Sequence, residues 1–224
     1  MIRHIPNFLT CCNLICGCLG VVFALEGRTF PAAYFVWIAC VFDFLDGFAA
    51  RMLKVSSPIG KELDSLADMV SFGLLPSIVM YTMFEAVQGR EYVPYIAFSI
   101  AVFSALRLAI FNVDTRQSDS FRGLPTPANA LLITALPLLT GEITNYFKSY
   151  LFLTIITIIS SYLMVSDIEL FALKFKNFSW QDNKIRFTFL LLSVLLLATL
   201  QLAAIPLIIL FYIALSLGVR AVSK

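Results

Sequence analysis

The sequence is poor in charge. Asp, Glu, Lys and Arg make up only 13% of its 224 residues, and the formal net charge is +2. A net charge this small provides no basic surface for a phosphate backbone, so we exclude nucleic acid as a partner. The chain also lacks low-complexity tracts and internal repeats, and its length is typical of a single domain.

Histidine is almost absent, which bears on whether the cysteines bind zinc. The single histidine is His4, and the five cysteines are Cys11, Cys12, Cys16, Cys18 and Cys40. Four of these cysteines crowd the first apolar segment, but their spacing fits no usual set of zinc ligands. We therefore interpret them as small hydrophobic side chains that pack in the protein or face lipid.

Apolar runs of membrane-spanning length recur along the whole chain, which is 60% hydrophobic with a mean hydropathy of +0.89. This pattern predicts an all-α integral membrane protein. We predict eight spans, at residues 8–26, 31–53, 62–85, 92–113, 126–146, 149–167, 185–200 and 202–219. The stretch before the first span is short and no small-residue cleavage site follows it. We therefore expect a permanent span there rather than a cleavable signal peptide.

Lysine and arginine are distributed unevenly between the two ends of these spans. With the N-terminus in the cytoplasm, 13 of the 16 basic residues fall on or near the cytoplasmic side, and only Arg28, Arg90 and Lys148 fall outside. An excess of basic residues on the cytoplasmic side is the usual bias of membrane proteins. We therefore expect a multi-pass protein of the cytoplasmic (inner) membrane with a cytoplasmic N-terminus.

Four aspartates interrupt this apolar background. Asp43, Asp46, Asp64 and Asp68 lie within 26 residues, in a chain that has only 14 carboxylate side chains. A charged side chain at the centre of a membrane helix costs about 2.5–3.5 kcal/mol, so four of them imply a penalty of about 10 kcal/mol. A compensating charge is therefore needed, and divalent cations are the obvious candidates.

The spacing of the aspartates predicts that they converge. Asp43 and Asp46 are three residues apart in one predicted helix, and Asp64 and Asp68 are four apart in the next, so each pair shares a helix face. A short connection makes the two helices antiparallel and brings both pairs to the cytoplasmic end. Four carboxylates in one pocket suit a hard cation such as magnesium, manganese or calcium, and magnesium favours sites that combine carboxylates with substrate phosphates.

Small residues and one arginine accompany the acidic cluster. Gly47 and Ala50 clear one helix face, and Gly60, with Pro58, breaks the chain before the next helix and allows close approach of backbone or ligand. Arg51 lies one turn beyond Gly47, where it is placed to meet a phosphate. These features favour a phosphorylated ligand beside the cations.

Two other interpretations of the aspartates were weighed. They could pair with basic residues to hold helices together, but only Arg51 and Arg107 are plausible buried partners. They could also form a proton- or cation-transport site, since acids inside membranes often mark relays. The glycines, Arg51 and the fixed spacing argue against transport, and we see no inverted repeats of the kind that cation-coupled transporters carry.

The aspartates and small residues together form a recognisable motif. The run Asp43-x2-Asp46-Gly47-x2-Ala50-Arg51-x8-Gly60-x3-Asp64-x3-Asp68 resembles the complete signature of the CDP-alcohol phosphotransferase family. The resemblance implies a six-helix transmembrane core, which we assign to residues 1–167. Residues 168–224 would then form a basic connection and about two extra C-terminal helices.

The resemblance also implies roles for the motif residues. Asp43, Asp46, Asp64 and Asp68 would hold two divalent cations, magnesium or manganese, and Asp68 would also be the general base. Gly47, Ala50 and Gly60 would line the cytidine pocket, and Arg51 would support the acidic cluster or the diphosphate. In this family an alcohol attacks the β-phosphorus of a CDP-linked lipid and CMP leaves. A homodimer is likewise implied.

Further segments resemble the bacterial branch of the family that uses serine. One is Pro6-Asn7-Phe8-Leu9-Thr10 with Asn13 and Gly17; the others are Arg107-Leu108-Ala109-Ile110-Phe111-Asn112-Val113 and Phe121-Arg122-Gly123-Leu124-Pro125-Thr126-Pro127-Ala128. Ile110 departs from that pattern, in which a second arginine is often found. The resemblance implies that CDP-diacylglycerol and L-serine are the substrates.

Serine is a zwitterion, so its site needs a cation for the carboxylate and acceptors for the amine. Arg107 and Arg122 are the available cations and Asn112 is a candidate polar contact, although Arg107 could instead snorkel to the interface and Arg122 could be a solvated loop charge. Thr10 and Asn13, one turn apart in an apolar helix, are interpreted as nucleotide contacts rather than packing residues. Glycerol 3-phosphate or an inositol phosphate is the alternative acceptor, but either would favour a denser basic patch. We expect catalysis to require metal and to fade as the pH falls.

Overall fold

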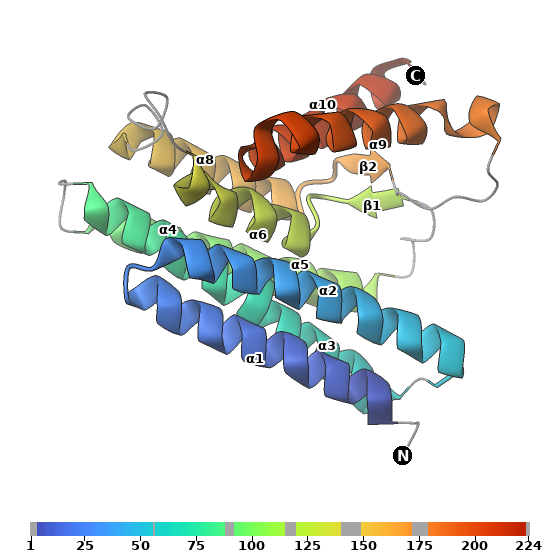
Figure 1. Ribbon diagram of the computed structural model, residues 1–224, viewed down its shortest axis with the longest axis horizontal. Coiled ribbons are helices and arrows are strands. Elements are labelled where there is room, and N and C mark those ends of the chain that lie inside the picture. Colours follow the sequence, from blue (N-terminus) through green and yellow to red (C-terminus); the bar gives the residue numbers. More distant parts are fainter. Residues whose placement is uncertain are drawn as a thin grey trace.

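The computed structural model describes residues 4–55, 57–87, 92–114, 120–139, 149–171 and 179–222, and most of these residues are helical (Figure 1). The helices are α1 (Ile5–Leu25), α2 (Thr29–Leu53), α3 (Pro58–Asp68), α4 (Leu75–Ala86), α5 (Phe98–Val113), α6 (Thr126–Ala135), α8 (Tyr150–Val165), α9 (Trp180–Leu200) and α10 (Ala204–Val222). The all-α class predicted from the sequence is confirmed.

Helices occur at each of the eight predicted spans. Five are long and apolar enough to cross a membrane: Ile5–Leu25, Thr29–Leu53, Pro58–Ala86, Val93–Val113 and Asn183–Leu200. Three apolar helices are shorter, at Thr126–Leu138, Tyr150–Val165 and Ala204–Gly218. The predicted span 126–146 is helical as far as Leu138, and its residues 140–146 lie outside the described part of the chain. The protein is therefore a multi-pass integral membrane protein.

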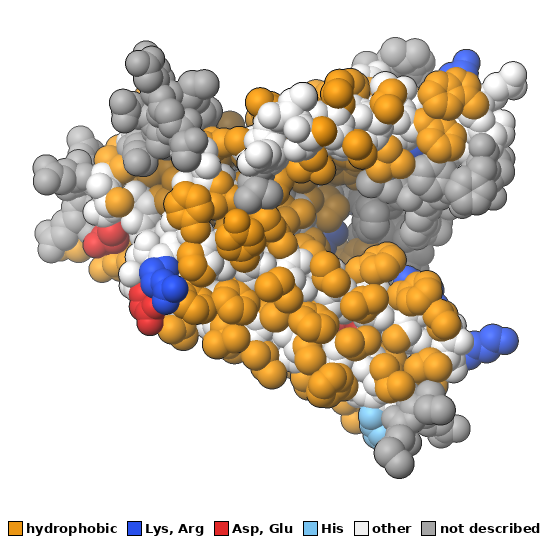
Figure 2. All heavy atoms as spheres, viewed as in Figure 1, with side chains coloured by type: hydrophobic (Ala, Val, Ile, Leu, Met, Phe, Trp, Pro, Cys, Tyr) orange, Lys and Arg blue, Asp and Glu red, His pale blue; other side chains and the backbone are white. Residues whose placement is uncertain are grey.

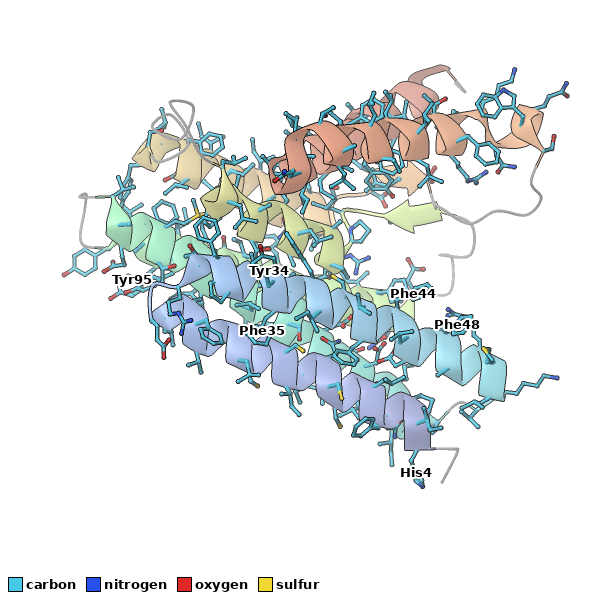
Figure 3. All side chains as sticks on the ribbon, in the orientation of Figure 1. His4, Tyr34, Phe35, Phe44, Phe48 and Tyr95 are labelled. Carbon is cyan, nitrogen blue, oxygen red and sulfur yellow. The ribbon has the colours of Figure 1, made fainter. Side chains whose placement is uncertain are left out.

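The outer surface of the bundle matches a lipid environment. Figure 2 shows hydrophobic side chains over the outer faces of α1 and α2, and large residues such as Phe8 and Ile15 on α1 are exposed. On α2 the rings of Phe44 and Phe48 stack with centroids 6.1 Å apart, and both side chains are exposed (Figure 3). Burying such faces in lipid removes the exposure that would be unfavourable in water.

Helix α3 begins where the sequence predicted a break. Pro58 occupies the first turn of α3, where a missing N–H does no harm, and the Ser57 hydroxyl accepts a hydrogen bond from the Gly60 N–H at 2.9 Å. Helix α2 ends a few residues earlier at Leu53, and Lys54 follows with a left-handed φ of 51° that closes the helix. The end of α2 and the start of α3 therefore meet at one end of the bundle, as the motif requires.

A π-helical turn interrupts the helix that carries Asp64 and Asp68. The turn spans Met69–Leu74 and begins immediately after Asp68, with Pro76 following in the first turn of α4. Pro76 has no N–H to donate to the carbonyl four residues back, at Phe72, so the chain passes through this stretch with a wider turn. The apolar pattern of the sequence predicts one regular span over residues 62–85 and gives no sign of this local irregularity.

Two short strands were also not anticipated. Strand β1 (Ser120–Arg122) pairs antiparallel with β2 (Glu169–Phe171), with Arg122 opposite Glu169. Gly123 follows β1 with φ at +71°, and a Cβ there would clash with the Met164 carbonyl oxygen, so this position requires glycine. Hydrogen bonds from the Gly123 N–H to the Ile168 carbonyl (2.9 Å) and from the Leu124 N–H to the Leu163 carbonyl (2.8 Å) complete the attachment.

The last two helices pack onto the rest of the bundle. Helix α10 contacts α6 and β2, and Figure 1 shows α9 and α10 alongside these elements. Phe189 of α9 and Tyr212 of α10 belong to the same buried apolar cluster as Phe84, Leu124 and Leu170. The C-terminal hairpin therefore shares the main hydrophobic core and supports the paired strands from one side.

Candidate active site

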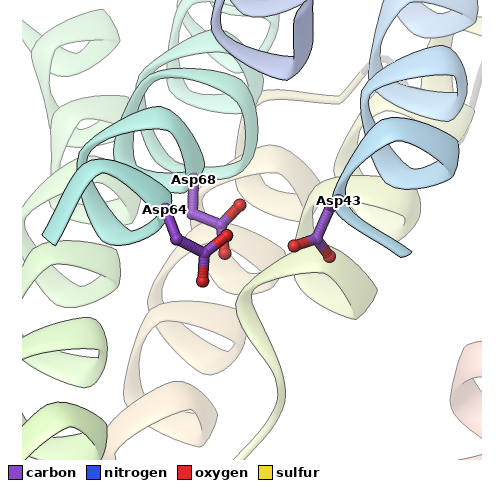
Figure 4. Close-up of side chains that lie close together, drawn as sticks. All are labelled: Asp43, Asp64 and Asp68. Atoms are coloured by element: carbon purple, nitrogen blue, oxygen red, sulfur yellow. The ribbon is translucent and has the colours of Figure 1, made fainter. Parts of the chain in front are cut away.

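Three of the four motif aspartates come together between α2 and α3. One carboxylate oxygen from each of Asp43, Asp64 and Asp68 lies within 4.8 Å of the others. Figure 4 shows Asp43 projecting from α2 toward Asp64 and Asp68 on α3. Asp68 is buried, with 8% of its surface exposed, and the other two are half-buried. The predicted convergence of the two helices is thus seen in the structure.

The fourth aspartate has a different immediate partner. Asp46, one helical turn after Asp43, is buried, and its Oδ2 accepts a hydrogen bond of 2.6 Å from the Thr10 hydroxyl. The same hydroxyl lies 3.0 Å from the Pro6 carbonyl oxygen, but it has one proton and the carboxylate is the closer acceptor. Helix α1 therefore orients Asp46 beside the cluster formed by the other three.

The donor set suits a divalent cation. Asp64 Oδ1 is buried and has no hydrogen-bond partner among the described residues, which leaves an anionic oxygen without compensation. No Lys or Arg in the described part of the chain forms an ion pair with any of the four aspartates. Among the described residues, these acids are therefore not joined to basic residues by ion pairs. Clustered, anionic, all-oxygen donors are the ligands that hard cations prefer.

A groove of about 970 Å³ lies beside the acidic cluster. Gly47, Ala50, Gly60 and Thr10, four of the six residues predicted to contact the CDP-lipid, line it together with Asp46, Asp64, Lys54, Lys61 and His4. Arg51 lies over Gly47, with Nη1 3.3 Å from the position that a Cβ on Gly47 would occupy. The groove is lined by both carboxylates and basic residues, an arrangement that can hold a metal-bound diphosphate.

Asn13, the sixth predicted nucleotide contact, is placed differently. Its side chain is completely buried and does not line the groove; instead its Nδ2 donates a hydrogen bond of 3.1 Å to Asp68 Oδ1. Thr10 and Asn13, three residues apart on α1, therefore face one motif carboxylate each. The sequence pattern identified both residues, but it gave no sign that their partners are aspartates.

A second, smaller pocket gathers two of the predicted acceptor residues. It has a volume of about 80 Å³ and is lined by Arg107, Phe111, Asp114, Arg122, Ser166 and Asp167, among others. Arg107 is buried and its Nη1 donates to the Thr126 hydroxyl at 3.1 Å, while its Nε has no partner among the described residues. The Arg122 guanidinium donates to Asp167 at 2.7 Å. Arg107 is therefore a buried residue and does not snorkel.

Asn112, the third predicted acceptor residue, lies apart from this pocket. Its Nδ2 donates to the Ser65 hydroxyl at 2.7 Å, and its carbonyl accepts from Lys61 Nζ at 2.8 Å, so it joins the end of α5 to α3. Sequence reasoning missed Asp167, which is 45 residues from Arg122 and belongs to no recognisable motif. It also assigned no role to Thr126, although this residue lies in the segment from Phe121 to Ala128 that resembles the serine-using branch.

Comparison with known proteins agrees with this geometry. The chain belongs to the CDP-alcohol phosphatidyltransferase family, whose sequence profile matches residues 3–220. The relatives of the chain narrow this class further. The CDP-diacylglycerol–serine O-phosphatidyltransferase of Helicobacter pylori (strain ATCC 700392 / 26695) is 32% identical over 200 residues, which cover 88% of this chain and 83% of the relative.

Two further relatives span bacteria and archaea. The CDP-diacylglycerol–serine O-phosphatidyltransferase of Bacillus subtilis (strain 168) is 33% identical over 168 residues, covering 75% of this chain and 89% of the relative. The archaetidylserine synthase of Methanothermobacter thermautotrophicus is 35% identical over 168 residues, covering 74% of this chain and 68% of the relative. The chain is thus similar to enzymes whose names specify serine as the acceptor.

Proposed function

We propose that this protein transfers a phosphatidyl group from CDP-diacylglycerol to the hydroxyl of L-serine, which yields phosphatidylserine and CMP. The observation that carries the proposal is the cluster of Asp43, Asp64 and Asp68 beside a groove of about 970 Å³. The names of the relatives support the choice of serine. A cation-coupled transporter is not favoured, because the matching family and these relatives are transferases.

The four aspartates have two roles at the reacting centre, metal binding and proton transfer. Asp43, Asp46, Asp64 and Asp68 would hold two divalent cations, magnesium or manganese. When bound, such ions neutralise the diphosphate and stabilise the charge that develops on the leaving CMP. Asp68 removes the proton from the attacking hydroxyl, because a serine hydroxyl is a weak nucleophile until a base accepts its proton.

The groove binds the nucleotide part of the lipid substrate. Gly47, Ala50 and Gly60 contribute little or no side chain to its wall, so the cytidine can approach the helix backbone there. Arg51, which turns back over Gly47, supplies a positive charge on the same side as the diphosphate. Thr10 contacts the groove as well, although its hydroxyl is directed to Asp46.

The smaller pocket binds the acceptor. Arg107 and Arg122 meet the carboxylate of serine, and Asp114 and Asp167 in the same pocket provide acceptors for its ammonium group. Asn112 supports this end of α5 through its bond to Ser65. Glycerol 3-phosphate or an inositol phosphate is the alternative acceptor. Both carry a phosphate, which has more negative charge than the carboxylate of serine, and neither has an ammonium group to meet the two carboxylates of the pocket.

The membrane arrangement follows from the distribution of basic residues. We place the active site on the cytoplasmic side of the inner membrane, because Lys54 and Lys61 border the groove whereas Arg28 lies at the opposite end of α2. Residues 1–167 form the catalytic core, and residues 168–224 form a basic connection and the hairpin that supports it. The family resemblance supports a homodimer.

The proposal is tested by supplying the acceptors one at a time. The purified protein is incubated with CDP-diacylglycerol and manganese or magnesium, and then with serine, glycerol 3-phosphate or inositol phosphate, and CMP release is measured. Release with serine alone is the expected result. Release with glycerol 3-phosphate overturns the serine assignment, and no release with any acceptor from folded protein overturns the enzyme proposal.

A further inference from the structure

Asn13 lies at the contact between α1 and the end of α3. It is 0% exposed, its Nδ2 donates to Asp68 Oδ1 at 3.1 Å, and its own Oδ1 is buried without a partner among the described residues. An amide that is closed off from the groove cannot contact a nucleotide lying in it. Among the described residues, the Asn13 side chain therefore forms its hydrogen bond with the Asp68 carboxylate.

The backbone around Asp68 is held by the same stretch of α1. The Ser71 hydroxyl, in the π-helical turn that follows Asp68, donates to the Asn13 carbonyl at 2.9 Å. One turn further along α1, a Cβ on Gly17 would lie 2.5 Å from Ser71 Oγ and 2.9 Å from Ser71 Cα. Glycine at this position lets the two backbones approach closely, so α1 is fixed against the π-helical turn.

Helix α1 acts on Asp68 in two distinct ways, through the backbone and through the side chain. The Ser71 bond and the close approach at Gly17 set the position of the backbone, whereas the Asn13 amide acts on the Asp68 side chain alone. A carboxylate has two oxygens, and a donor that occupies one of them sets the direction of the other. Without the amide, Asp68 retains its place in the helix but loses the restraint on its side-chain torsion.

We propose that Asn13 is a positioning residue for the transfer reaction, which holds one oxygen of Asp68 so that the other faces the attacking hydroxyl. This inference rests on the proposed function, in which Asp68 is the base. It replaces the nucleotide contact that the sequence pattern predicted for Asn13. A small displacement of a catalytic group is sufficient to lower turnover, because proton transfer depends on a narrow range of distance and angle.

The size of the effect follows from the kind of contact. A hydrogen bond to a charged group is among the stronger ones in proteins, and losing it in the reacting state corresponds to a decrease of about 10- to 100-fold in turnover. Binding of CDP-diacylglycerol should change little, because Asn13 does not line the groove. The expected signature is a lower kcat with an unchanged KM for the lipid substrate.

The experiment compares Asn13→Leu with Ser71→Ala in the full-length protein. Leucine removes the amide with little change in volume, and Ser71→Ala removes the other hydrogen bond between α1 and the π-helical turn without touching the Asp68 carboxylate. Measured quantities are kcat, KM for CDP-diacylglycerol, KM for serine and the midpoint of thermal unfolding in detergent. Asn13→Ala, which also lacks the donor and adds no charge beside Asp68, provides a second variant if the leucine variant does not fold.

The expected result is a decrease in kcat of at least about tenfold for both Asn13 variants and of less than about twofold for Ser71→Ala. A raised KM for CDP-diacylglycerol with unchanged kcat overturns the proposal and restores the nucleotide contact. Equal losses of kcat in Ser71→Ala and Asn13→Leu also overturn it, because the role would then be helix packing. An inactive wild-type protein refutes the proposed function, which distinguishes that failure from this one.

Discussion

The hydrogen bond between Thr10 and Asp46 allows a test of how α1 supports the site. At 2.6 Å it lies in the range of charge-assisted O–H···O⁻ bonds, and both residues are buried, with 3% and 6% of their surfaces exposed. Replacing Thr10 by valine retains the shape of the side chain and removes only the hydroxyl. Asp46 Oδ2 then loses this charge-assisted hydrogen bond.

The magnitude can be estimated from these features. A hydrogen bond to a charged group contributes about 1.5–3 kcal/mol, and valine leaves no cavity, so we expect a loss of about 2 kcal/mol in the free energy of unfolding. For a chain of this size that corresponds to a decrease in the unfolding midpoint of about 4–8 °C. Thr10→Ser retains the hydroxyl and serves as the matched control, with a smaller decrease that reflects only the missing methyl group.

The measurement is thermal unfolding of the purified protein in detergent, together with KM for CDP-diacylglycerol. A midpoint for Thr10→Val equal to that of the wild type would refute the reasoning, since it would mean that the hydroxyl does not stabilise Asp46. A raised KM with an unchanged midpoint would point to a nucleotide contact instead. In that case the hydrogen bond of the structure would not be the one that matters during turnover.

Three further predictions concern the reaction itself. Asp68→Asn should lower kcat by about 10²–10⁴-fold while binding of CDP-diacylglycerol is largely retained. The two quantities are measured by CMP release in timed samples and by ligand titration. Lost binding with normal chemistry in the bound fraction would refute the base role. Chelation by EDTA should abolish CMP release and added manganese should restore it, because Asp64 Oδ1 and the neighbouring carboxylates need a cation. Activity that survives chelation would contradict the proposed metal site. Gly123→Ala should raise KM for serine more than KM for the lipid. The new Cβ would clash with the Met164 carbonyl oxygen at a φ of +71°, so the segment that carries Arg122 would have to move. Equal changes in both KM values would contradict this prediction.

Much of the fold was predictable because membrane helices have a strong local signal. A run of about 20 apolar residues is needed to cross the hydrocarbon core whatever its neighbours are, so the eight helices were located from the sequence alone. The π-helical turn at Met69–Leu74 and the pairing of β1 with β2 were not located. Both features are defined by backbone hydrogen bonds, and the two strands pair residues about 50 positions apart in the sequence. Segments of three to six residues are too short to show a periodic pattern of apolar side chains.

The candidate site, too, could be predicted from the sequence only in part. The convergence of Asp43, Asp64 and Asp68 was predictable, because helical periodicity and one short connection are enough to bring them together. The partners of Thr10 and Asn13 were not, because the rotation of α1 about its own axis is determined by packing against α2 and the π-helical turn.

The sequence by itself determined that this is a multi-pass membrane protein with a cluster of aspartates, since apolar length and carboxylate spacing are local properties of the chain. Only the tertiary structure decided which of its polar residues meet. It joined Arg107 and Arg122 in one pocket, separated Asn112 from them, and directed Asn13 to Asp68. The physical reason is that a buried polar group is stable only beside a suitable partner, and which partner lies within reach is decided when the helices pack.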